Sequence, residues 1–325
     1  MNGLLLALAA LVLWSISPFF FTNMGKRVGP FSTNLLRLAL ALVFLIVLVA
    51  IRTLWGWEIP PPQPAAWFWL ATSGIVGLAI GDAFLYRAFV TVGPERTSQI
   101  QTLAPAATAA IAWVCLKEYL TMGQLAGMGL ILAGVFMATS SAARGKTAWL
   151  AAEAQAEAAI LPVGAAPDGA SAGEKPGSYL WTGAMAAVWS ALFQGLGTVL
   201  ARQAFLGQAD LDPLVATTVR IAVGTTVLWA YARTLGPLGQ TLGDWSRPKV
   251  LRLLVAGTLF GPVMGMLCYI GALKFAPAGI VTTITFMAPL LIIPIGAKLY
   301  GTSITTATVW GTALSLAGVA LLGLG

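Results

Sequence analysis

The chain contains an internal duplication, and this feature constrains its fold more than any single residue does. Glycines and prolines recur at an offset of 184 residues, so that Gly77 corresponds to Gly261 and Pro105 to Pro289. The tetrapeptide Leu-Ala-Gly-Val at 132–135 also returns at 316–319. The chain is therefore predicted to fold as two copies of one structural unit.

Ten apolar stretches run along the chain, five in each copy of the unit. With 58% hydrophobic and 9% charged residues, and a mean hydropathy of +0.86, the chain is too apolar for a water-soluble fold. A helix needs about 20 apolar residues to cross the hydrocarbon layer of a bilayer. The sequence predicts an all-α polytopic membrane protein with transmembrane helices over 3–22, 31–51, 66–88, 97–116, 121–140, 179–200, 214–235, 249–271, 278–298 and 304–324.

The ten helices divide into two repeats joined by a polar segment. Residues 1–140 are expected to form the first five-helix repeat and residues 179–325 the second. The Ala-, Pro- and Gly-rich segment 141–178 is predicted to be a disordered linker. Because five is an odd number, the second repeat enters the membrane from the opposite face, which predicts an inverted repeat of the kind that many transporters use.

Composition also excludes several classes of chemistry. The chain has no histidine, so imidazole proton relays, histidine metal sites and Ser-His-Asp catalysis are excluded. The cysteines Cys115 and Cys268 both lie inside apolar stretches. We expect no metal and no other cofactor. The formal charge of +7 comes from bases spread through short loops, so the expected partner is the lipid bilayer and not nucleic acid.

The distribution of Lys and Arg predicts an orientation. Eleven of these residues fall in loops on the side reached after odd-numbered helices, and four fall on the other side. By the positive-inside rule, the odd-helix side would face the cytoplasm and both termini would lie outside.

Asp82 is the acid that lies inside an apolar stretch, with Met266 at the corresponding position of the second repeat. A charge at the centre of a bilayer costs about 2.5–3.5 kcal/mol on insertion scales, so it normally has a partner or a function. One interpretation is a fixed ion pair with Arg37, Arg87 or Arg220. The other is a substrate or proton site.

Two arginines and two prolines occupy equivalent positions in the repeats. Arg37 and Arg220 lie about 10 Å into the second helix of each repeat. They could bind a substrate carboxylate or brace the scaffold, and their presence in both repeats favours bracing. Pro105 and Pro289 are predicted to kink the fourth and ninth helices near mid-membrane. The freed carbonyls could line a site or act as a hinge, or the kinks could serve helix packing alone.

Polar and small residues complete the pattern. The fourth helix opens with Gln99 and Gln101, which cannot share one helix face, so at most one of them points inward. The corresponding segment of the second repeat keeps only hydroxyls, among them Thr283. Glycines such as Gly127 and those of the Leu-Ala-Gly-Val repeats are predicted to let helices pack closely.

These features together resemble the ten-helix EamA-type members of the drug/metabolite transporter superfamily. The resemblance covers nearly the whole chain apart from the linker, and the second repeat departs from it where Thr302 stands at the position of Glu118. The residues that carry it are Trp14 and Trp189 in the first helix of each repeat, Arg37 and Arg220, and the pattern from Thr102 and Pro105 to Leu116 and Glu118.

The resemblance implies a central cavity formed by helices of both repeats, and termini in the cytoplasm, opposite to the charge distribution. Orientation is therefore left open. Carried over to this sequence, the substrate-binding residues are expected to be Trp14, Asp82, Tyr86, Gln99, Trp189, Gln194, Tyr269 and Thr283.

The expected function is secondary-active transport of small metabolites, such as amino acids or related amphipathic compounds, by a multi-pass protein of the plasma or inner membrane. Export is the expected direction, protons are the candidate coupling ion, and the protein is expected to be a monomer or homodimer. The chain lacks a Gly-x-x-x-x-Gly-Lys-Ser/Thr loop for ATP. The alternatives are a non-transporting sensor or assembly factor that works through the linker, and an intramembrane lipid-modifying enzyme.

Overall fold

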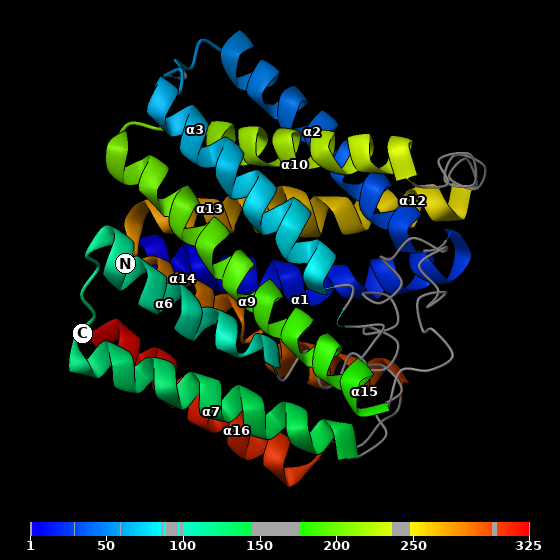
Figure 1. The fold of residues 1–325 in the computed structure, drawn as a ribbon, viewed down its shortest axis with the longest axis vertical. Helices are drawn as coiled ribbons and strands as arrows, with labels where there is room; N and C mark the ends of the chain where they lie inside the picture. The colour runs from blue at the N-terminus through cyan, green and yellow to red at the C-terminus, as the bar shows by residue number, and fades with distance from the viewer. Residues whose placement is uncertain are drawn as a thin grey trace.

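The computed structural model describes residues 2–28, 30–58, 60–85, 88, 97, 100–144, 176–235, 248–300 and 304–324 (Figure 1). The first repeat supplies α1 (Asn2–Val28), α2 (Pro30–Leu54), α3 (Pro64–Ser73), η1 (Gly74–Gly81), α6 (Leu103–Leu116) and α7 (Met122–Arg144). The second repeat supplies α9 (Pro176–Gly207), α10 (Pro213–Leu235), α12 (Pro248–Thr258), η2 (Leu259–Gly265), α13 (Met266–Phe275), α14 (Ala278–Thr285), α15 (Ala288–Tyr300) and α16 (Thr306–Leu324).

The all-α membrane fold with ten spans is confirmed. Within the described residues, eight helical segments are long and apolar enough to cross a membrane, and the shorter apolar helices Asn2–Ser17 and Leu103–Leu116 fall in the first and fourth predicted spans. Helices α7 and α9 extend a few residues into the predicted linker, to Arg144 and from Pro176. The central part of that linker, 145–175, lies outside the described residues.

The third helix of each repeat changes from α-helix to π-helix within one residue of the equivalent position. In the first repeat α3 continues into η1, and in the second α12 continues into η2, which contains Pro262. The two π-helical stretches end at the equivalent residues Gly81 and Gly265, so Asp82 and Met266 are the first residues beyond them. Such wider turns are frequent at functional sites. The sequence pattern did not predict them.

Pro105 and Pro289 each follow an interruption of their helix. Helix α14 ends at Thr285, a turn follows, and Pro289 is the second residue of α15. In the first repeat, a turn at Thr102 precedes α6, and Pro105 is the third residue of that helix. Both prolines therefore sit in a first helical turn, where the missing N–H has no intrahelical partner to lose.

The helices of the two repeats interleave. Helix α1 of the first repeat packs against α12, η2, α13, α14 and α15 of the second. In the same way α9, the first helix of the second repeat, packs against α3, η1 and α6 of the first. The centre of the molecule is therefore built from both repeats, and Figure 1 shows α9 lying between α3 and α6.

Helices α7 and α16 form a closely packed pair at one edge of the bundle (Figure 1). A Cβ atom added to Gly127 would lie 2.8 Å from the carbonyl oxygen of Gly318. The glycines Gly134 and Gly311 approach each other's carbonyl oxygens in the same manner. These pairs are related by the sequence repeat, and they confirm that the glycines of the Leu-Ala-Gly-Val segments serve helix packing.

Both chain termini lie at one end of the bundle (Figure 1). We call this the terminus-side end. The connections that follow α2, α6, α9 and α13 lie at the same end, because each of them follows an even number of membrane crossings. This end carries a network of polar contacts that links the two repeats, described below.

Candidate functional site

Arg220 lies at the centre of the molecule, where α10 meets η1 and α9. Its side chain is 4% exposed. Its Nη2 atom would be 2.9 Å from a Cβ atom added to Gly77, and a Cβ added to Gly197 would be 2.7 Å from the Cα of Gly77. The two glycines therefore allow η1 to approach α9 and leave room for the guanidinium beside them.

Two of the three nitrogens of the Arg220 guanidinium have no hydrogen-bond acceptor among the described residues. Both Nε and Nη1 are buried without a partner. Nε carries one hydrogen and Nη1 carries two, and the group stays charged in proteins. A charge in this position is costly unless another group compensates it.

Asp82 is an acid whose negative charge acts on Arg220. It caps the end of η1, and its backbone N–H donates to the carbonyl of Ala79. Its side chain is partly exposed, and among the described residues Arg37 and Arg220 act on it electrostatically. Because Nε and Nη1 of Arg220 have no partner, Asp82 does not engage either atom.

The polar centre thus combines two cations and one anion among these residues. Arg87, the third arginine that the sequence offered as a partner for Asp82, lies outside the described residues.

An aromatic pair joins α1 to α13 beside this centre. The rings of Trp14 and Tyr269 are 5.0 Å apart between centroids, and the indole Nε1 of Trp14 donates to the carbonyl of Gly261 at 3.3 Å. The hydroxyl oxygens of Tyr269 and Thr198 are 2.6 Å apart. Since Thr198 donates its own hydrogen to the carbonyl of Gln194, the Tyr269 hydroxyl donates to Thr198. The expected site residues Trp14 and Tyr269 are therefore in contact.

A second polar cluster lies along α9. The amide nitrogen of Gln194 donates to the hydroxyl of Ser190 at 3.2 Å, and Gln101 donates to the same hydroxyl at 2.8 Å. The side-chain oxygen Oε1 of Gln101 is buried without a hydrogen-bond partner among the described residues. Sequence analysis placed Gln99 in the site and left Gln101 out. Gln99 lies outside the described residues, so the polar side chain that the structure places here is Gln101.

The remaining expected site residues occupy different surroundings. Trp189 is 46% exposed and its ring lies 5.9 Å from that of Phe193. Thr283 is fully buried, and its hydroxyl donates to the carbonyl of Gly279 on its own helix. Tyr86 lies outside the described residues. The structure thus brings Trp14 and Tyr269 into contact beside Thr198, while the side chain of Gln194 bonds Ser190 on its own helix.

Polar contacts hold the two repeats together at the terminus-side end, where sequence analysis assigned no site. Arg202 on α9 donates from Nε to the carboxylate of Glu118 at 2.7 Å, and from Nη1 to the carbonyl of Leu273 at 2.6 Å. The other carboxylate oxygen of Glu118 accepts the backbone N–H of Ala278 at the start of α14. This arginine and glutamate therefore join α9, α13 and α14 to the loop after α6.

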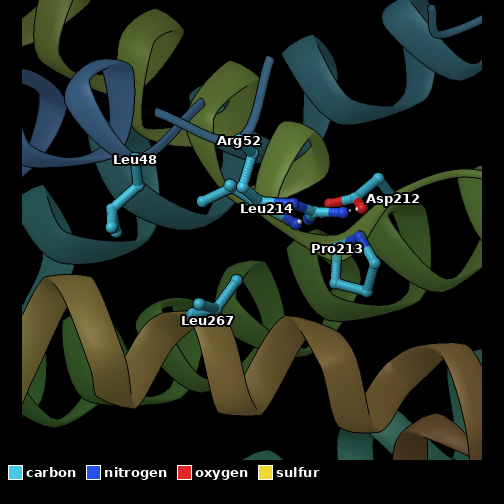
Figure 2. A pocket seen from close by; sticks show the side chains of 6 residues that line it. All are labelled: Leu48, Arg52, Asp212, Pro213, Leu214 and Leu267. Atoms are coloured by element: carbon cyan, nitrogen blue, oxygen red, sulfur yellow. Dashed lines mark hydrogen bonds and ion pairs between the residues drawn. The ribbon is translucent and has the colours of Figure 1, made fainter. Parts of the chain in front are cut away.

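Two further contacts at this end also cross between the repeats. The buried side chain of Gln208 accepts the backbone N–H of Gln63 and donates to the carbonyl of Pro61. Arg52 at the end of α2 pairs with Asp212 at 2.7 Å, and this pair lines a pocket between α2, α10 and α13 (Figure 2). Neither pair of residues stands out in the sequence, because polar residues at helix ends are ordinary.

No metal-ligand cluster is found in the described ranges: no three His, Cys, Asp or Glu side chains come together there. The polar centre is instead a set of arginine, carboxylate, amide and hydroxyl groups. Such groups can bind a polar organic molecule and orient it through hydrogen bonds and charge.

The comparisons with known proteins agree with this architecture. A search of the curated proteins gives no match. Twenty-eight chains of solved structures match. One of them, titled "Crystal structure of protein", has a TM-score of 0.71 and 19% sequence identity, and the match covers 99% of this chain and 96% of that one. This similarity shows a shared fold.

The model of the EamA-like transporter family matches residues 1–140 and 181–324, one match for each repeat. Together the two matches cover most of the sequence and leave out the segment between the repeats. The chain belongs to the EamA-like transporter family.

Proposed function

We propose that this protein is a secondary-active transporter of small metabolites that carry a carboxylate group, with amino acids and related amphipathic compounds as the leading class. Export across the plasma or inner membrane is part of the same proposal. Membership of a transporter family supports the general activity. The substrate class rests on the polar centre described above.

The observation that carries the proposal is that Nε and Nη1 of the buried Arg220 guanidinium have no hydrogen-bond acceptor among the described residues. The two atoms lie at a place where helices of both repeats meet. A carboxylate is the acceptor that matches a guanidinium best in charge and shape.

Sequence analysis favoured a bracing role for Arg220. A bracing arginine would be expected to donate to carboxylates or carbonyls of neighbouring helices, as Arg202 does. The missing acceptors of Arg220 therefore favour substrate binding over bracing.

Asp82 is proposed to bind the ammonium group of a zwitterionic substrate or to carry the coupling proton. It is partly exposed and lies directly beyond η1, where the helix can adjust its turns. The aromatic pair of Trp14 and Tyr269 offers an apolar surface beside the charged groups. A zwitterion with an apolar side chain fits this combination of charge and aromatic surface.

Alternating access supplies the proposed mechanism. The contacts of Arg202, Gln208 and Arg52 close the terminus-side end by linking the two repeats. For a substrate to leave or enter at this end, these contacts must open while the repeats rock about the centre. The inverted arrangement of the repeats supports such a motion, because the same packing can form at either end.

The test is flux into proteoliposomes with a pooled panel of amino acids, the corresponding amino-acid amides and organic cations, at two pH gradients. We expect flux of carboxylate-bearing compounds and none of the amides. Arg220→Met should abolish this flux, and Asp82→Asn should abolish it or remove its dependence on the pH gradient. Inside-out and right-side-out vesicles would distinguish export from import.

Exposed residues provide matched controls. Asp210→Asn and Arg252→Met make the same chemical changes at exposed positions and should transport as the wild type does. Undiminished flux in Arg220→Met would refute the carboxylate site. Full transport by Asp82→Asn at every pH would remove Asp82 from the mechanism.

A further inference from the structure

The pocket at the terminus-side end differs from the polar centre in position and in lining. It has a volume of about 320 Å³, and its apolar walls are Leu48 of α2, Pro213 and Leu214 of α10, and Leu267 of α13. Figure 2 shows the ion pair of Arg52 and Asp212 on one side of this pocket and Leu48 and Leu267 on the others. The walls therefore come from both repeats.

The pocket lies where the bilayer changes from headgroups to hydrocarbon. Arg52 is in the last turn of α2, and the exposed Trp55 and Trp57 follow it. Exposed tryptophans at the end of a membrane span are typical of the membrane interface. Leu48 precedes Arg52 by one helical turn, about 6 Å further into the membrane. The pocket thus has a polar part at the interface and an apolar part beside the acyl chains.

The lipid-facing surface of α2 makes this pocket accessible from the bilayer. Ile46 and Val47 on this helix are exposed, as is part of Leu48 itself. In a protein of this class, large apolar side chains that are exposed over a membrane span contact lipid. A molecule that enters the pocket from this side is therefore a component of the bilayer.

The charges at the pocket favour a headgroup that carries both signs. Arg52 and Asp212 remain 31% and 15% exposed although they pair with each other. One carboxylate oxygen of Asp212 accepts the N–H of Leu214, and each oxygen has a second lone pair for a further donor. Two exposed acids, Glu58 and Asp210, flank the pair in the sequence. Lys274 adds a second cation, whose ammonium donates to the carbonyl of Leu211 beside Asp212. With two cations and three acids, these surroundings remain acidic by one charge, which disfavours a purely anionic headgroup and favours one that also has an ammonium group.

We propose that this pocket binds a zwitterionic phospholipid with a primary ammonium headgroup, of the phosphatidylethanolamine class. Its phosphate lies against the exposed part of Arg52, and its ammonium group donates to Asp212. An acyl chain fills the space between Leu48 and Leu267. Since the walls belong to both repeats, the bound lipid bridges them at the end that the polar contacts close.

The experiment measures lipid retention by native mass spectrometry. The protein is taken from mixed micelles that contain equal amounts of palmitoyl-oleoyl phosphatidylethanolamine, phosphatidylcholine and phosphatidylglycerol. We expect the phosphatidylethanolamine adduct to dominate. Leu48→Trp, which fills the pocket and leaves the ion pair in place, should lower its affinity about tenfold, as expected when about two methylene groups lose their burial. Arg52→Gln should reduce the preference among the three headgroups.

Two further variants keep the result interpretable. Leu267→Trp fills the pocket from the opposite wall and should act as Leu48→Trp does. Ile46→Trp places the same side chain on an exposed position of α2 outside the pocket and should retain lipid as the wild type does. Equal retention of all three lipids, preference for phosphatidylglycerol, or retention unchanged in both pocket-filling variants would overturn the proposal. None of these readouts depends on transport.

Discussion

Two buried arginines of the second repeat have opposite surroundings. Arg202, near the terminus-side end of α9, has a side chain that is 13% exposed and donates to Glu118 and to the carbonyls of Leu273 and Lys274. Arg220, in the first half of α10, is 4% exposed, and its Nε and Nη1 have no acceptor among the described residues. The comparison shows that one arginine is hydrogen-bonded to neighbouring helices, whereas the other has guanidinium nitrogens without acceptors among the described residues. The presence or absence of hydrogen-bond acceptors therefore distinguishes an arginine that links helices from one that is available to bind a ligand.

The largest effect on stability is expected from Arg202→Met. The change leaves the carboxylate of Glu118, which is 11% exposed, without its cation. Removing one partner of a buried ion pair typically costs about 3–5 kcal/mol. The free energy of unfolding in mixed micelles measures the loss, with Arg252→Met as the exposed control. A loss no larger than that of the control would show that this contact does not hold the repeats together.

Gln208→Ala should have an intermediate effect. It removes the side chain that accepts from Gln63 and donates to Pro61, and so leaves two backbone groups of the loop after α2 unpaired. Because Pro61 and Gln63 are exposed, water can replace part of each bond, and a typical intramolecular hydrogen bond contributes about 0.5–1.5 kcal/mol. The same unfolding measurement applies, and Gln203→Ala on α9 is the control, since this side chain is only partly buried. Equal stability of the two variants would mean that water replaces the lost bonds.

Arg52→Gln should cost about 1 kcal/mol or less, because its ion pair with Asp212 is partly exposed. The difference from the wild type should shrink further in 1 M NaCl, where the screening length falls to about 3 Å. Unfolding at low and high salt tests both statements. A loss as large as that of Arg202→Met, or one that salt does not change, would contradict the view that solvent screens this pair.

Arg220→Met should leave stability unchanged or raise it, although it should abolish flux. The substitution removes a buried charge that has no acceptor for Nε and Nη1 and replaces it with an apolar side chain of similar length. Thermal unfolding in detergent and proteoliposome flux, measured on one preparation, test the combination. A fall in stability like that of Arg202→Met would show that Arg220 braces the scaffold, and the contrast between the two arginines would disappear.

Sequence patterns predicted the helices well because each span satisfies its backbone within itself. All ten predicted spans correspond to helical segments, and the offset between the repeats also matches the ends of η1 and η2 at Gly81 and Gly265. The glycine pairs of α7 and α16 follow from the same repeats, since closely packed helices need small residues where they cross. These properties are local or depend on a single helix pair.

The candidate site was only partly predictable. Trp14 and Tyr269 were expected to line one site, and the structure places their rings in contact, with the Tyr269 hydroxyl bonded to Thr198, which sequence analysis had not selected. The side chain of Gln194, expected in the same site, bonds Ser190 on its own helix. Thr283 satisfies its hydroxyl on its own helix, as threonines in helices commonly do. Which side chains meet depends on helix rotations, and a pattern that is apolar on nearly all sides gives little information about rotation.

The sequence by itself determined that the chain crosses the membrane in ten helices, arranged as two inverted repeats. The reason is that apolar length and helical hydrogen bonding act within each span. Only the tertiary structure decided that α1 packs into the second repeat and α9 into the first. It also decided that Arg202 has acceptors while Nε and Nη1 of Arg220 have none. Both outcomes depend on contacts between helices far apart in the chain, where shape and small residues select neighbours that no local pattern specifies.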